Sequence, residues 1–118
     1  MKKIYQIAAG FDVELTLEVD LEKMTSEIAT EINNFWSGSE DVLAASNGDV
    51  IEAAIRRAAP ILIHAAIDGW NAIGMINQFN YLEGWPDVDQ LGIRVLSFQI
   101  PDIDAVSLDV SVVDRGAA

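Results

Sequence analysis

The single histidine of the chain, His64, is followed four residues later by Asp68. On a helix this spacing places both side chains on one face, where a carboxylate can orient an imidazole for acid–base chemistry. A hydrolytic triad also needs a nucleophile, and no nucleophile-elbow pattern surrounds any of the candidate serines: Ser37, Ser39, Ser97 and Ser107. We therefore predict that His64 is a packed or paired histidine in a helix core. No catalytic residue is assigned, and the protein is not expected to be an enzyme.

Two pairs of aspartates could hold a hard cation such as calcium, Asp87 with Asp89 and Asp102 with Asp104. An EF-hand loop needs further ligands, a central glycine and a distant glutamate in fixed register, and these are missing. Each pair follows a proline, which is typical of an ordinary turn. The chain has no cysteine, and neither G-x-G-x-x-G nor G-x-x-x-x-G-K occurs. We expect no metal and no cofactor.

The chain is strongly acidic, with 7 basic and 19 acidic residues among 118 and a net charge of −12. Such a chain repels nucleic acid phosphates and anionic membrane surfaces, and it favours encounter with a basic protein. The alternative is that the charge serves solubility. The most apolar stretch, residues 50–67, contains too many polar residues for a transmembrane helix. The N-terminal apolar run is too short for a signal peptide, so we expect a location in the cytosol.

One acidic surface is predicted where the chain carries no basic residue, between Lys23 and Arg56. Glu27 and Glu31 lie four residues apart on one predicted helix, and two like charges at this spacing destabilise a helix by about 0.2–0.5 kcal/mol. Tryptophan is enriched at the centres of protein interfaces. The candidate partner-binding residues are Glu27, Glu31, Trp36, Glu40 and Asp41.

A second acidic surface is predicted on one face of a strand, at Asp12, Glu14 and Glu18. Side chains on the same face of a strand recur about every 6.5–7 Å, so this row could imitate the charges of a nucleic acid backbone. For both surfaces the alternative is an ordinary solvated face.

The elements that carry these residues follow from hydrophobic periodicity. Residues 11–20, "FDVELTLEVD", alternate with period two and predict a half-buried strand, with "KKIYQIAAG" as its hairpin partner. A helix is predicted over residues 21–37, capped by Asp20 and ended by Gly38. Its apolar stripe consists of Leu21, Met24, Ile28, Ile32 and Phe35. We therefore expect Phe35 to be buried and Trp36 to lie at the edge of the stripe.

A short helical turn is predicted from Ser39 to Ala45, and "SNG" then breaks the chain. Asp49 should cap a helix that begins at Val50, is apolar almost all round, and kinks at Pro60. After a loop, "IRVLSFQI" and "AVSLDVSVV" read as two strands around a "PDID" turn.

The predicted order is β-β-α-(short α)-α-β-β within a single domain, residues 1–118. Strand pairs that flank helices favour an α+β fold, an antiparallel sheet of about four strands with the helices packed on one face.

The motifs "LTLEVD", "EINNFW", "GDVIEA" and "EGWP", in this order and at this spacing, resemble an uncharacterised family of small phage and prophage proteins. The resemblance implies a viral or mobile-element origin and brings no catalytic residue with it. With the acidic charge, it favours a protein that binds and blocks a host protein, in the manner of an anti-CRISPR or other anti-defence inhibitor.

Two alternatives remain open: a small-molecule or nucleotide sponge that uses the Trp70–Trp85 region, and a structural or accessory phage protein without an inhibitory role. The oligomeric state, monomer or homodimer, is also left open.

Overall fold

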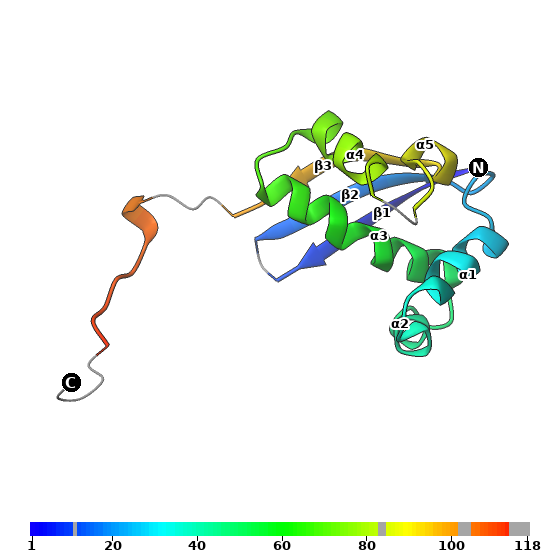
Figure 1. Cartoon of the computed structure of the whole chain (residues 1–118), viewed down its shortest axis with the longest axis horizontal. Helices are drawn as coiled ribbons and strands as arrows, with labels where there is room; N and C mark the ends of the chain where they lie inside the picture. The colour runs from blue at the N-terminus through cyan, green and yellow to red at the C-terminus, as the bar shows by residue number, and fades with distance from the viewer. Residues whose placement is uncertain (11, 83–84, 102–104, 114–118) are drawn as a thin grey trace.

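The computed structural model describes residues 1–10, 12–82, 85–101 and 105–113. It has α+β architecture, with the main helices lying across one face of a small antiparallel sheet (Figure 1). The predicted fold class is thereby confirmed. The elements are β1 (Lys2–Ala9), β2 (Val13–Asp20), α1 (Ser26–Phe35), α2 (Ser39–Ala45), α3 (Val50–Ile67), α4 (Ala72–Asn80), α5 (Val88–Leu91), β3 (Ile93–Gln99) and a 3₁₀ turn (Ala105–Ser107).

The sheet has the order β1-β2-β3, and both neighbouring pairs are antiparallel. The predicted hairpin and the alternation along β2 are confirmed: Leu15, Leu17 and Val19 are completely buried against the helices. These residues form one core with apolar side chains of α1, α3 and α4. Phe11, predicted on the same face, lies outside the described residues.

The prediction of a fourth strand is wrong. The stretch "AVSLDVSVV" begins with the 3₁₀ turn, and its described residues beyond the turn belong to no strand. Val110 and Val112, which alternation would place on one face of that strand, are 91% and 95% exposed. Period-two alternation reports which side chains share a face. It does not report whether a neighbouring strand accepts the segment.

The first helix begins later than predicted, and its buried face is different. Thr25 caps it, because its hydroxyl oxygen accepts the N–H of Ile28 at 3.3 Å. Asp20 instead accepts the N–H of Glu22 at 3.0 Å in a preceding turn. Leu21 and Met24 therefore lie outside the helix, and the predicted stripe does not continue along one helical face. Phe35 is 65% exposed, so the prediction that it belongs to the core is wrong.

The longest helix, α3, is the centre of the fold and contains eight buried residues. Asp49 caps it as predicted, accepting the N–H groups of Ile51 and Glu52. The helix runs through Pro60 for 18 residues. One stripe at helical spacing stays in solvent: Arg56, Pro60, His64 and Ile67. His64 is thus exposed, and the interpretation of it as a core histidine is wrong, because even a mostly apolar helix keeps one face in water.

Tyr5 of β1 supplies a pH-dependent prediction. Its partial burial, and then the carboxylates of Asp49 and Glu52, raise the pKa of its phenol above the ordinary value of 10.0. The folded state therefore holds this proton more tightly than the unfolded state. The resulting stabilisation is present below pH 10.0 and is lost as the pH rises through the folded-state pKa. We expect the free energy of unfolding to fall in that range.

The pKa of Tyr5 is measured by titrating phenolate absorbance in a Tyr81→Phe background, where Tyr5 is the remaining tyrosine. Asp49→Asn should lower the pKa of Tyr5, and asparagine preserves the helix cap. An unchanged titration in Asp49→Asn would contradict the assigned electrostatic cause.

Candidate functional site

Four aromatic rings lead from the core to the surface at the end of α1. Phe79 of α4 is completely buried and contacts Trp85, with ring centroids 5.0 Å apart. Trp85 lies against Trp36 at 6.2 Å with an interplanar angle of 30°, and Trp36 meets Phe35 edge-on at 4.9 Å. We call Phe79, Trp85, Trp36 and Phe35 the aromatic ladder. Its outer rungs are exposed, Trp36 by 40% and Phe35 by 65%.

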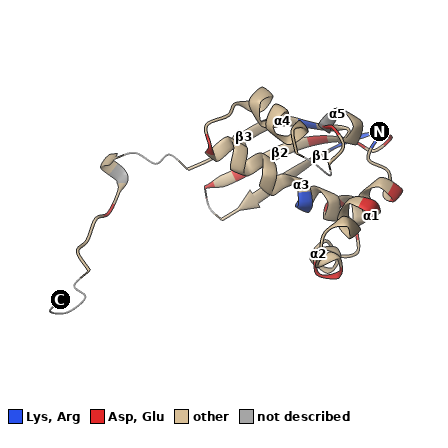
Figure 2. Cartoon of the chain, viewed as in Figure 1, with Lys and Arg blue, Asp and Glu red and all other residues tan. Residues whose placement is uncertain are grey.

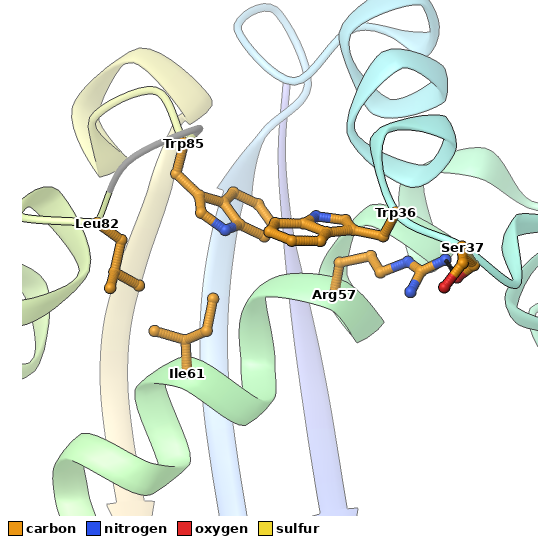
Figure 3. A pocket seen from close by; sticks show the side chains of 6 residues that line it. All are labelled: Trp36, Ser37, Arg57, Ile61, Leu82 and Trp85. Carbon is orange, nitrogen blue, oxygen red and sulfur yellow. Dashed lines mark hydrogen bonds between the residues drawn. The ribbon is translucent and has the colours of Figure 1, made fainter.

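Beside the ladder is an open hollow of about 390 Å³, lined by Trp36, Ser37, Arg57, Ile61, Leu82 and Trp85. Figure 3 shows the two indoles side by side above Ile61 of α3, with the Arg57 side chain directed toward Ser37. Trp70, which the sequence grouped with Trp85, is not among the lining residues. A Cβ added at Gly74 would lie 2.6 Å from a ring carbon of Trp70, so the indole packs against Gly74 near the start of α4.

Arg57 and Asn33 position the chain that carries Trp36. The Arg57 guanidinium donates to Asn33 Oδ1 at 3.1 Å and to the carbonyl oxygens of Asn33 and Ser37 at 3.4 and 3.0 Å. The Asn33 amide donates to the Ser39 carbonyl at 3.0 Å. These bonds join the end of α1, the start of α2 and the side of α3. Sequence reasoning missed this network, because Asn33 resembles any polar helix residue and Arg57 lies 24 residues away.

Asn33→Ala tests this network. Asn33 is 3% exposed, and its truncation removes the acceptor of the Arg57 Nε–H and the side-chain donor to the Ser39 carbonyl in a partly buried place. We expect the free energy of unfolding to drop by about 1–3 kcal/mol, measured by denaturant titration. The neighbouring exposed residue is the matched control: Asn34→Ala should change stability by at most about 0.5 kcal/mol. Equal effects of the two substitutions would contradict the role given to Asn33.

The four predicted carboxylates are all exposed, on the two helices that precede and follow Trp36. Glu27 and Glu31 are on α1, and Glu40 and Asp41 are in the first turn of α2. Figure 2 shows acidic positions and no basic position on these two helices. Among the described residues, none of the ion pairs involves any of the four.

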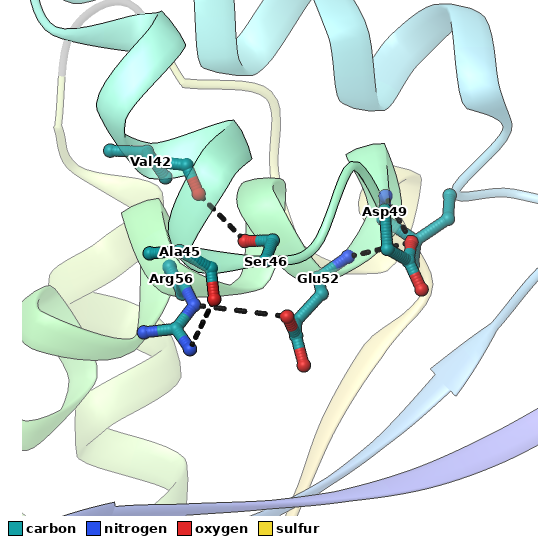
Figure 4. A network of polar contacts seen from close by, with 7 residues as sticks. Val42, Ala45, Ser46, Asp49, Glu52 and Arg56 are labelled. Carbon is teal, nitrogen blue, oxygen red and sulfur yellow. Dashed lines mark hydrogen bonds and ion pairs between the residues drawn. The ribbon is translucent and has the colours of Figure 1, made fainter.

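Two arginines of α3, Arg56 and Arg57, are engaged by the backbone of α2 and of the segment that follows α1. Arg56 donates to the Ala45 carbonyl at 3.2 Å and pairs with Glu52 at 3.9 Å (Figure 4). Arg57 is directed to Asn33 and Ser37, as described above. The negative charge of α1 and α2 is therefore left facing solvent. We name this surface, comprising Phe35, Trp36 and the four carboxylates, the α1–α2 corner.

The second predicted acidic face is partly neutralised. Glu18 of β2 pairs with Lys2 of β1 at 3.9 Å, and Arg94 of β3 lies opposite Glu18 in the sheet register. Glu14 is exposed on the same strand, while Asp12 lies in the turn between β1 and β2. The structure thus places the basic side chains of β1 and β3 on either side of the acidic row of β2. Alternation within β2 alone could not indicate which side chains its neighbours would bring.

Within the described residues, no group of three or more potential metal ligands comes together. Asp102, Asp104 and the side chain of Asp89 lie outside that part of the chain. The described helices include none with the length and apolar character needed to cross a bilayer.

Comparison with known proteins identifies relatives in phage. The chain is 36% identical over 100 residues to protein ea10 of Escherichia phage lambda, an alignment that covers 79% of this chain and 81% of the relative. The same values hold for the lambda prophage-derived protein ea10 of Escherichia coli O6:H1, strain CFT073. No solved structure matches the chain significantly. The family model described as "Protein of unknown function (DUF2528)" matches residues 14–109. The predicted resemblance is confirmed: this chain belongs to the DUF2528 family, a family of unknown function with members in phage and prophage.

Proposed function

We propose that this protein binds a host protein with a basic, nucleic-acid-binding surface and blocks it, as an anti-defence inhibitor of the anti-CRISPR kind. One observation carries the proposal. Two large aromatic side chains, Phe35 and Trp36, are exposed in edge-on contact, and the helices before and after them, α1 and α2, carry four exposed carboxylates that have no ion-pair partner in the described part of the chain.

The two parts of the α1–α2 corner would contribute differently. Exposed carboxylates steer a basic partner and raise the rate of association, an effect that falls as salt rises. An aromatic side chain that becomes buried at an interface supplies affinity, commonly about 2 kcal/mol or more. Trp36 is suited to this role because Trp85 and Arg57 hold its surroundings in place, so little side-chain freedom is lost on binding.

The outer face of the sheet supports the same function less well. Lys2 already pairs with Glu18, and a basic partner would have to displace it. This face therefore serves as the control surface.

The experiment is capture from a lysate of the phage host with the full chain as bait, followed by competition. A specific partner should be a basic protein whose binding to DNA or RNA is reduced by the chain, and the capture should weaken as salt rises. Reversal variants of the two acidic surfaces then locate the contact. A partner retained equally by both reversal variants and by wild type would contradict the proposal. A partner found in phage particles would indicate a structural or accessory role.

A second candidate function rests on the hollow between Trp36 and Trp85. Two indoles whose planes differ by 30° lie beside an arginine, and a planar anionic molecule such as a nucleotide can stack on them. Thermal melting with a panel of nucleotides tests it. A rise in Tm that disappears in Trp85→Leu, with no host protein captured, would favour the sponge over the inhibitor.

A further inference from the structure

One edge of the sheet is open and borders an apolar groove. In the described structure β3 pairs with β2 on one side only. Along this free edge lies a hollow of about 320 Å³ between α4 and β3, lined mainly by Ile73, Ile76, Ile93, Arg94 and Val95. Ile73 is 73% exposed. The edge thus offers backbone hydrogen-bonding groups and an apolar surface to an added strand.

The segment of residues 108–113, which we call the arm, has the pattern of a strand that fits such an edge. Leu108, Val110 and Val112 alternate with Asp109 and Ser111. The three apolar side chains are exposed. Figure 1 shows the arm apart from the sheet and the helices.

We propose that the arm of a second copy of this chain adds to the free edge of β3, and that two copies exchange arms to form a dimer. Pairing beside β3 directs Leu108, Val110 and Val112 toward Ile73 and Ile76 in the groove. It directs Asp109 to the opposite face, beside Arg94, so that the charges of arm and edge are complementary. When the exchange is reciprocal, the backbone groups of both arms find hydrogen-bonding partners, and the assembly closes as a dimer with two-fold symmetry.

The other edge of the sheet fits the arm poorly. Lys2 and Lys3 lie on β1, and lysines on an edge strand discourage the addition of another strand. The hollow next to β1 is lined by polar side chains that include Gln6, Glu52 and Arg56. Among the described residues the arm forms no strand, so it does not occupy the free edge of β3 in its own chain.

Cross-linking of single-cysteine variants tests the exchange, because the chain contains no natural cysteine. Ile73→Cys protein and Val110→Cys protein are refolded together and treated with a short bismaleimide. We expect covalent dimers that contain one molecule of each variant, and wild type with a mass in solution twice that of one chain. A wild-type mass in solution that stays that of a monomer would overturn the proposal. A variant that carries both cysteines is the second check: if it cross-links only within its own chain, the arm folds back on its own sheet and the proposal fails.

Matched arm variants sharpen the test. Val110→Asp should weaken dimerisation more than about tenfold, because it buries a charge in the groove. Ser111→Asp, on the other face of the same strand, should weaken it far less. Arg94→Glu should weaken the dimer about two- to fivefold, and Asp109→Arg should restore it. Equal effects of the two aspartate substitutions would contradict the pairing.

The salt dependence separates this dimer from the proposed host complex. Each copy carries a net charge of −12, so the two copies repel each other and salt should strengthen the dimer. Salt should weaken a complex with a basic partner. The dimer can therefore fail its test without affecting the proposed function.

Discussion

Trp36→Ala should weaken the captured complex at least about thirtyfold, mainly through faster dissociation, while the chain stays folded. The exposed Trp36 indole rests on the half-buried Trp85, which in turn contacts the completely buried Phe79. Its burial against a partner removes apolar surface from water without a large loss of freedom. The measurement is the dissociation rate of the purified complex by surface-based kinetics, with circular dichroism as the check on folding.

The carboxylates of the α1–α2 corner should behave differently from Trp36. The pair of reversals Glu27→Lys and Glu31→Lys should slow association and flatten its salt dependence, with a smaller change in the dissociation rate. Folding should be unharmed, because neither reversal breaks an ion pair among the described residues.

The matched control is the pair Glu14→Lys and Glu18→Lys on the sheet. If only the sheet variants slow association, the contact surface lies on the sheet and the α1–α2 corner is the wrong site. If neither pair has an effect, the acidic charge serves solubility.

Phe79→Ala should lower the free energy of unfolding by about 3–5 kcal/mol, the range for removing a buried phenyl ring. Phe79 is completely buried and its ring contacts Trp85, so the substitution leaves a cavity and also removes the contact that supports the Trp85 indole. Because small domains are stable by about 5–15 kcal/mol, this is a large part of the total. Denaturant unfolding followed by tryptophan fluorescence measures it.

Phe35→Ala is the control at the other end of the ladder. Phe35 is mostly exposed, so its removal should change stability by about 0.5 kcal/mol or less. A loss comparable to that of Phe79→Ala would restore the sequence-based prediction that Phe35 is a core residue.

The sequence by itself determined the elements whose signals are local. Strict alternation along β2 identified the strand and its buried face, and Asp49 identified the start of α3 because a cap acts on the next two or three residues. The α+β class followed from the order of these elements. The family was recognisable from short motifs, and the acidic charge of the candidate site was readable directly from composition.

Tertiary packing decided the rest, because periodicity reports which residues share a face and not what covers that face. The face of α1 that meets α3 carries Asn33 and excludes Phe35, a choice set by the Arg57 network from another helix. Trp36 and Trp85 meet across 49 positions of sequence, and no local signal in either segment encodes that contact. The arm has the alternation of a strand but pairs with no strand in the described part of its own chain. A strand forms only where hydrogen-bonding partners are supplied, and those partners belong to the assembled structure.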